Sequence, residues 1–218
     1  MPRKPNAVTA QAKAQRRQDY LNTARALFLQ QHSLPSVAAL AAEAGLAKGT
    51  VYRYFQSKEQ IFIALLSDDF SQLFTGLGKL IDELPTQPED AATKFAAAFT
   101  ALLQQSDSLL PLMAMLTAVL EQKLPQAELL AFKQQLAQAL QLLGQRLAKR
   151  IHRLTAEQAA QLLLHSYALT LGLYQATCLP ESVQQMLQQA GLQTLQRDFA
   201  SELTAALSAL WHGKLGRA

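Results

Sequence analysis

The segment Ser36–Phe55, SVAALAAEAGLAKGTVYRYF, constrains the fold more than any other part of the chain. Its first half repeats apolar residues at the i, i+3, i+4, i+7 spacing of a helix with one buried face, at Val37, Leu40, Ala41 and Ala44. Gly45 can end this helix because glycine tolerates a positive φ. A further short helix is predicted over residues 47–55, directly after the turn. Two short helices joined by so tight a turn predict a helix-turn-helix.

The second of these helices has one face that can anchor it and one that stays polar. Its anchoring residues, expected to point inward, are Leu46, Val51 and Phe55. Its outer face carries Lys48, Gly49, Tyr52 and Arg53. In a helix-turn-helix the second helix presents its outer residues to the major groove of DNA. The segment therefore predicts DNA recognition.

The remainder of the chain also follows helical patterns. A capping-box motif, in which Ser or Thr is followed three residues later by Gln, occurs at Ser57 and again at Thr155. β-branched residues are sparse and no strand-like alternation is present, so an all-α fold of about nine helices is expected. The predicted helices cover residues 16–31, 37–44, 47–55, 58–82, 89–105, 109–122, 126–152, 156–178 and 191–211.

Charge divides the chain into two unequal parts. Residues 1–58 hold nine basic and two acidic residues, whereas residues 59–218 have a net charge of −3. The basic part has the size of a nucleic-acid-binding module. The domains expected from this division are a flexible basic arm over 1–15, a helix-turn-helix domain over 16–58 with a linker helix at 58–82, and a second domain over 83–218.

Several functional classes find no support in the sequence. Cys178 is the single cysteine, which excludes an internal disulfide and favours a reducing compartment. The N-terminus lacks the apolar core of a signal peptide and no run of about 20 apolar residues occurs, so a cytoplasmic protein without a membrane span is expected. The four histidines are scattered, and no phosphate loop or nucleophile motif is present. No metal, cofactor or enzymatic activity is therefore expected.

One motif carries a family resemblance. AKGTVYRYF followed by QSKE, residues 47–59, resembles the stretch SKGTLYHYF-SKE of the tetracycline-repressor (TetR) family. The preceding TARALFLQQ and VAALAAEAG are similar to the family's first two helices. The resemblance covers about residues 16–65, and the rest matches only in length and helical content. It implies a three-helix DNA-binding domain followed by a helical domain for ligand binding and dimerisation.

The resemblance implies that three residues of the motif read the DNA sequence. Arg53 would make a bidentate contact with guanine, and Lys48 and Tyr52 would reach a base edge or a phosphate. Two alternatives remain open at this point. Tyr52 could be a core aromatic residue, and Arg53 could merely cover a solvated face.

The other residues of the motif are implied to position the protein on the phosphate backbone. Ser36 at the start of its helix, Tyr54 and Lys58 would hold phosphates, which orient the protein without specifying a sequence. Thr50 would contact a phosphate or a thymine methyl group, and Gly49 would let the backbone approach the groove. Tyr54 could instead pack its ring in the core while still offering its hydroxyl.

The chain departs from the family pattern in two places. Ala47 stands where the family usually has Ser or Thr, so the reading helix lacks a side-chain cap, at a cost of roughly 1 kcal/mol. The link over residues 30–34 is one residue shorter than usual, with His32 where a glycine is common.

The C-terminal helices are expected to form a homodimer. Helix 156–178 is apolar on more than one side and must therefore be buried on two sides. In the resembled family the last two long helices of each subunit pair into a four-helix interface, which places two reading helices about one DNA turn apart on a near-palindromic operator. The expected interface residues are Leu163, Tyr174, Leu192, Leu195, Phe199, Leu203 and Leu210.

The apolar residues of the C-terminal domain either line a ligand cavity or form an ordinary core. The candidate lining residues are Phe95, Phe99, Met113, Met115, Leu116, Phe132 and Tyr167. Because few charges lie near them, a small apolar or aromatic effector is expected. It would shift helix 58–82 like a lever and release a repressor from its operator. In the alternatives, the C-terminal domain binds a protein partner or no ligand, or the chain binds DNA without sequence preference.

Overall fold

Helices follow one another along the whole described chain in this computed structural model, which describes residues 7–31, 33–45, 47–116 and 121–216. No strand occurs within these ranges, so the all-α prediction is confirmed. The elements are α1 (Ala7–Gln31), α2 (Val37–Glu43), α3 (Lys48–Tyr52), α4 (Lys58–Asp82), α5 (Pro88–Leu103), α6 (Leu109–Met115), α7 (Glu121–Lys123), α8 (Gln126–Arg150), α9 (Ala156–Thr177), α10 (Glu181–Gln189), the 3₁₀ helix η2 (Gln193–Leu195) and α11 (Phe199–Leu215).

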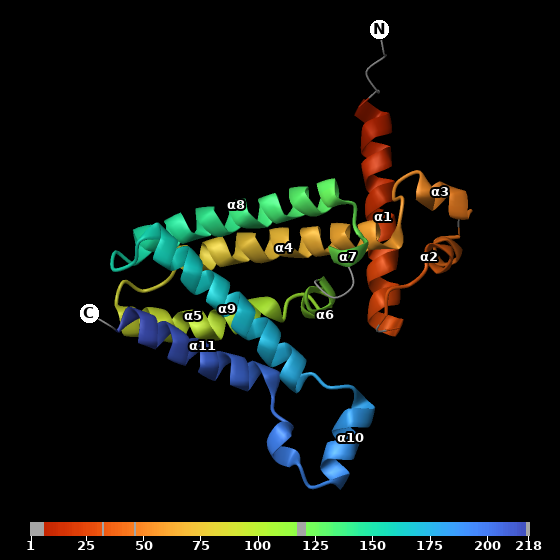
Figure 1. Cartoon of the computed structure of the whole chain (residues 1–218). Coiled ribbons are helices and arrows are strands. Elements are labelled where there is room, and N and C mark those ends of the chain that lie inside the picture. The colour runs from red at the N-terminus through yellow and green to blue at the C-terminus, as the bar shows by residue number, and fades with distance from the viewer. Residues whose placement is uncertain (1–6, 32, 46, 117–120, 217–218) are drawn as a thin grey trace.

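The first three helices form a group at one end of the molecule (Figure 1). α2 and α3 lie together on one side of α1 and are joined by a turn in which Gly45 has a φ of +66°. This is the left-handed backbone conformation for which glycine was expected there. Their shared core contains apolar side chains from all three helices, namely Tyr20, Leu21, Phe28, Val37, Leu40, Val51 and Phe55.

The C-terminal domain is built from long helices that pack in pairs. α4 lies along α8, and α5 lies along α11, while α9 packs against both α8 and α11 (Figure 1). α4 begins directly after the helix-turn-helix and runs through this domain, so a single helix belongs to both parts of the molecule. Both predicted ends of that helix, residues 58 and 82, agree with the structure.

Two predicted helix boundaries are wrong at the ends of the chain. α1 begins at Ala7 rather than near Arg16, so residues 7–15, which were assigned to the arm, are the first part of this helix. The helix predicted over 191–211 does not exist as one element. Gly191 ends α10 with a φ of +71°, and Asp198 caps the start of α11 by accepting a hydrogen bond from the Ser201 amide.

Some expectations fall on residues outside the described ranges. These are the first six residues, His32 of the shortened link, and Leu46, which was expected to point inward. The predicted helix 109–122 is represented by α6, which ends at Met115, and by the short α7.

Candidate DNA-binding surface and effector cavity

The reading helix α3 is anchored on one side and open on the other. Val51 and Phe55 are buried, as predicted, whereas Lys48, Gly49 and Arg53 are exposed. Ala47 provides no side-chain hydrogen bond at the start of this helix, in agreement with the departure seen in the sequence. The backbone amides at this end are therefore left to solvent or to a ligand.

Tyr52 belongs to the open side of α3. Its side chain is 45% exposed, so the alternative that it is a core aromatic residue is wrong. The Lys48 Nζ atom lies 5.9 Å from the centroid of its ring. The two side chains thus share one surface, and DNA contact by them stays a prediction.

The Tyr54 ring packs against another aromatic ring, and the residue also lies at the protein surface. Its ring meets that of Tyr20 in a T-shaped contact with centroids 5.2 Å apart. It also lines a surface groove of about 400 Å³ between α1 and α3, together with Ala12, Lys13, Arg16, Thr50 and Arg53. The groove has three basic side chains and no acidic one among its lining residues, which suits a phosphate backbone.

Lys13 and Arg16 belong to this surface but were not among the predicted DNA-binding residues, and Lys13 was assigned to the arm. They reach the groove because α1 extends back to Ala7 and carries them beside α3. The Ala- and Gln-rich composition of residues 7–15 was the available signal, since both residue types favour helix.

Ser36 and Lys58 lie at helix starts, as the motif implies. The Ser36 hydroxyl caps α2 by accepting a hydrogen bond from the Ala39 amide at 3.1 Å. It retains its own proton for donation to a phosphate. Lys58 is the first residue of α4 and is partly exposed, directly after the Ser57 cap, which accepts from the Gln60 amide at 3.2 Å.

One buried carboxylate connects the two domains. Asp69 in the middle of α4 accepts a hydrogen bond from Arg25 of α1 at 2.6 Å and one from the Ser108 hydroxyl at 2.8 Å. Arg25 also donates to that hydroxyl. Because Ser108 precedes α6, three helices of different roles meet at this carboxylate.

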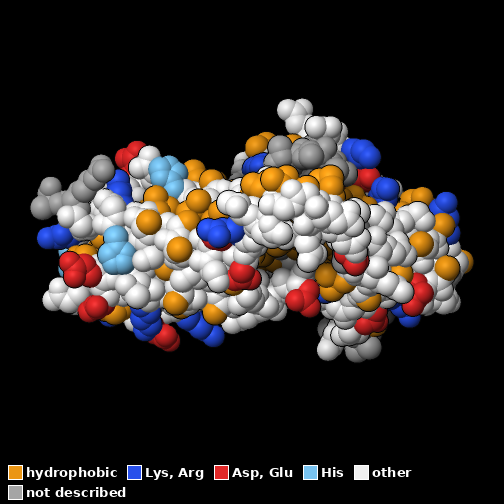
Figure 2. Space-filling model, turned by 90° about the horizontal axis from the view of Figure 1, so that it is seen from below, with side chains coloured by type: hydrophobic (Ala, Val, Ile, Leu, Met, Phe, Trp, Pro, Cys, Tyr) orange, Lys and Arg blue, Asp and Glu red, His pale blue; other side chains and the backbone are white. Residues whose placement is uncertain are grey.

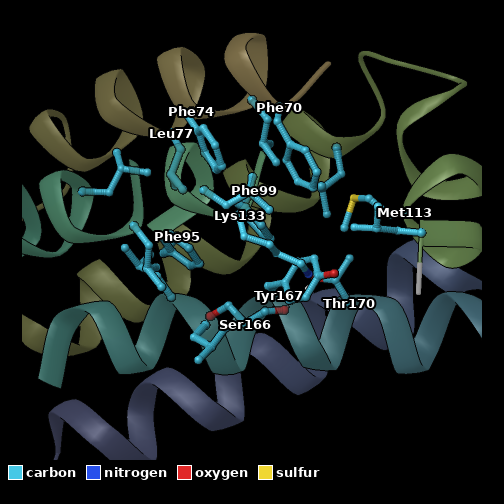
Figure 3. A pocket seen from close by; sticks show the side chains of 18 residues that line it. Phe70, Phe74, Leu77, Phe95, Phe99, Met113, Lys133, Ser166, Tyr167 and Thr170 are labelled. Atoms are coloured by element: carbon cyan, nitrogen blue, oxygen red, sulfur yellow. Dashed lines mark hydrogen bonds between the residues drawn. The ribbon is translucent and has the colours of Figure 1, made fainter. Parts of the chain in front are cut away.

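The C-terminal domain encloses a cavity of about 220 Å³ between α4, α5, α6, α8 and α9. Five of the predicted residues line it, namely Phe95, Phe99, Met113, Leu116 and Tyr167. Figure 3 shows aromatic side chains of α4 and α5 pointing into this space.

Two predicted lining residues lie elsewhere. Met115 does not line the cavity, because successive residues of a helix are turned by about 100° and its neighbours Met113 and Leu116 point inward instead. Phe132 is buried against Phe70, with ring centroids 6.3 Å apart, rather than in the cavity.

The sequence did not reveal most of the cavity wall. Side chains at helical spacing along α4, α8 and α9 supply it, together with Leu103 of α5. These residues are Phe70, Leu73, Phe74, Leu77, Lys133, Leu136, Leu140, Leu143, Leu163, Leu164, Ser166 and Thr170. Helix 58–82 was interpreted as a linker only, although its Phe70, Leu73, Phe74, Leu77 spacing indicated a buried face.

A tryptophan closes the wall behind the cavity. Trp211 of α11 is fully buried and stacks on Phe95 with ring centroids 3.6 Å apart. Its Nε1 donates to the Ser166 hydroxyl at 3.0 Å, and that hydroxyl donates to the Leu162 carbonyl. Thr170 in turn donates to the Ser166 carbonyl. The hydroxyls of Ser166 and Thr170 therefore both donate their protons to backbone carbonyls of α9.

The residues predicted for a dimer interface do not form one surface. Leu203 is completely buried in its own domain, and Leu163 lines the cavity. Leu192 and Leu195 are exposed but precede α11, because the predicted last helix is interrupted. Phe199 and Tyr174 meet in a T-shaped contact, 5.7 Å between centroids. With Leu210 they are partly buried.

Two negative findings concern the described residues alone. None of their helices is long and apolar enough to cross a membrane. They contain no group of three or more His, Cys, Asp or Glu side chains that could hold a metal ion.

Two family models match the chain in succession. Residues 21–65 match the bacterial regulatory proteins of the tetR family, and residues 67–218 match the tetracyclin repressor-like C-terminal domain. The fatty acid metabolism regulator protein of Bacillus subtilis (strain 168) is 35% identical over 66 residues, which are 30% of this chain and 34% of that protein. The match thus spans about a third of that relative's length.

Solved structures share the fold over nearly the whole chain. A TetR-family transcriptional regulator from Mesorhizobium loti MAFF303099 has a TM-score of 0.60 at 19% identity, with 93% of this chain and 96% of that chain covered. The fatty acid degradation regulator FadR from Bacillus halodurans has a TM-score of 0.56 at 16% identity, covering 99% and 97%. FadR from Bacillus subtilis in complex with stearoyl-CoA has a TM-score of 0.55 at 20% identity, covering 88% and 95%.

The order of these two matched regions agrees with the helix-turn-helix at the N-terminal end and the cavity-bearing helical domain behind it. The chain belongs to the TetR family of transcriptional regulators, which bind DNA and are not enzymes.

Proposed function

We propose that this protein is a repressor that binds a near-palindromic operator as a homodimer and leaves it when a small, largely apolar effector occupies the cavity. The observation that carries this proposal is the double role of α4. Its first residue follows the helix-turn-helix, and its middle, from Phe70 to Leu77, forms one wall of the cavity. A ligand that binds better to a displaced α4 shifts the population toward that state.

The Asp69 carboxylate supports a second route between cavity and DNA. Arg25 ties it to α1, and Ser108 ties it to the start of α6. α6 lines the cavity with Met113 and Leu116. A ligand that moves α6 would therefore displace the Asp69 carboxylate, which also binds Arg25 of α1. α1 in turn shares its apolar core with the two helices of the reading motif.

The cavity and the relatives favour an effector with an apolar body. Fourteen of the lining side chains belong to Leu, Phe and Met. The relatives include fatty acid regulators, one of them solved with stearoyl-CoA. At about 220 Å³ the cavity is smaller than the 300–1,000 Å³ typical of ligand sites, so a short chain or a small ring fits it best.

The outer faces of α9 and α11 are the surface we propose for dimerisation. Their exposed residues include several small ones, at Ala168, Gly172, Ala205, Ala209 and Gly213, and small residues let helices approach closely. A Cβ added at either of these glycines would meet no atom within 4 Å. Figure 2, seen from below relative to Figure 1, shows mostly uncharged atoms with scattered charges.

Selection of DNA fragments from a random pool by the purified protein tests the proposal. We expect enrichment of an inverted repeat whose half-sites are about one helical turn apart, bound by two chains. Enrichment of a single half-site bound by one chain would contradict the dimer. Equal affinity for all fragments, with the same salt dependence, would favour binding without sequence preference.

Release from the enriched operator by a panel of compounds tests the effector. We expect small compounds with an apolar body to lower operator affinity. If highly charged compounds alone released the protein, the proposed effector class would be wrong.

A further inference from the structure

The proposed effector cavity has one charged side chain among the described residues that line it, Lys133 of α8. The apolar wall is otherwise interrupted by the polar side chains of Ser166, Tyr167 and Thr170, all on α9. Lys133 and these three residues give the cavity a polar part, and the remainder of its wall is apolar.

Lys133 lies where the cavity opens. It lines the cavity and is nevertheless exposed to solvent, as is Leu164 of α9. Figure 3 shows its side chain extending into the cavity toward Tyr167. The opposite wall is closed by the buried ring of Phe95, which stacks on Trp211. A ligand therefore meets an ammonium group at the opening and aromatic rings at the inner end.

Two of the three hydroxyls in the polar strip do not substitute for this cation. Ser166 and Thr170 donate their protons to carbonyls of their own helix, so they can accept from a ligand but have no proton left for an anion. Among the described lining residues, the Lys133 ammonium is the group that can give an anion charge-assisted hydrogen bonds from a cation.

We infer that the effector is a monoanionic amphiphile, a carboxylate on a short apolar body, whose carboxylate meets Lys133 and whose apolar part fills the space between Phe95, Phe99 and Leu77. This inference rests on the proposed effector function of the cavity and names the ligand's chemistry. A head with several phosphates would require several cations, and the described lining residues provide one.

The chain contains a built-in reporter for this site. Trp211 is its single tryptophan, and it contacts two lining residues through its stack on Phe95 and its hydrogen bond to Ser166. Intrinsic fluorescence of the free protein therefore reports occupancy of the cavity without DNA.

The experiment is a fluorescence titration of the full chain with octanoate, octanol and octanoyl-CoA, three probes with the same apolar part. We expect octanoate to bind about tenfold more tightly than octanol, the lower end of the range for a hydrogen bond to a charged group, because Lys133 is exposed. Lys133→Met should remove this difference and leave octanol binding unchanged. Lys149→Met, at an exposed residue of the same helix that does not line the cavity, should leave all three affinities unchanged.

Three results would overturn the inference: octanol binding as tightly as octanoate, Lys133→Met keeping the difference, or octanoyl-CoA binding more tightly than octanoate. Failure of the proposed function looks different. If octanoate binds with the expected preference but does not lower operator affinity, the ligand chemistry stands and the proposed release from DNA fails. If none of the probes changes the fluorescence or a calorimetric signal, the cavity takes no such ligand and both are overturned.

Discussion

Arg25 and Asp69 form an ion pair of 2.6 Å between the DNA-binding domain and the cavity-lining helix α4, and the Asp69 side chain is 2% exposed. A carboxylate so deeply buried is tolerated because it is paired and hydrogen-bonded at both oxygens. The pair fixes α1 against α4 beside the start of α6, a helix that lines the cavity. It thereby relates the orientation of the reading helix to the packing of the C-terminal domain.

Replacing Asp69 with Asn should weaken both stability and communication between the domains. The amide leaves the partly buried Arg25 without its counter-charge, and we expect a loss of about 2–3 kcal/mol in the free energy of unfolding, below the range for a fully buried pair. Asp68→Asn, at the adjacent residue, is the matched control and should change stability by less than about 0.5 kcal/mol. Denaturant unfolding measures both. Equal losses in the two variants would show that the ion pair has no special role.

Arg53 and Lys58 should affect DNA binding in different ways. Arg53→Ala should cost about 1–3 kcal/mol on the operator and relax base preference, because the exposed guanidinium is the proposed reader of a base. Lys58→Ala should weaken binding evenly on all sequences and reduce its salt dependence. Fluorescence anisotropy on operator and random DNA separates the two effects. Equal losses on both DNAs for both variants would contradict this division.

Tyr20→Phe should leave the protein as stable as the parent or slightly more stable. The Tyr20 hydroxyl is buried and has no hydrogen-bond partner among the described residues, and burial raises the pKa of this phenol. Removing an unsatisfied polar atom while keeping the ring against Tyr54 avoids a desolvation cost of about 1 kcal/mol or more. Thermal unfolding gives the answer. A variant destabilised by more than about 1 kcal/mol would mean that the hydroxyl does have a partner.

Ala209→Arg should convert the proposed dimer into monomers. Ala209 is exposed on the outer face of α11, where an arginine would hold two approaching helices apart. Ala137→Arg, at an exposed residue of α8 away from this face, is the matched control and should leave the assembly unchanged. Sedimentation velocity measures both variants. Persistence of a dimer in Ala209→Arg would place the interface elsewhere.

Local signals predicted much of the fold. α4 was predicted at both ends because Ser57 caps its start and the segment Leu84–Pro88 breaks the chain after it. The reading helix was recognised together with its missing cap at Ala47. The last helix was misplaced because an apolar stripe that runs across Gly191 cannot show that the backbone turns there.

Contacts between distant parts of the chain were beyond local patterns. Arg25 and Asp69 are 44 residues apart, and no spacing rule joins them. The wall of the cavity is assembled from five helices, so periodicity identifies the buried faces but not which of them surround an empty space. For the same reason nothing in the local pattern of α8 indicated that Lys133 lines the cavity.

Reciprocal titration of DNA and ligand tests the central claim, that occupancy of the cavity controls DNA binding, most directly. Operator affinity is measured with and without saturating octanoate, and octanoate affinity is measured with and without saturating operator. The account predicts that each ligand lowers the affinity for the other by the same factor, of about 5- to 150-fold, as thermodynamic linkage requires of coupled sites. Octanoate that binds the cavity equally well in the free and operator-bound protein, with operator affinity unchanged, would contradict it.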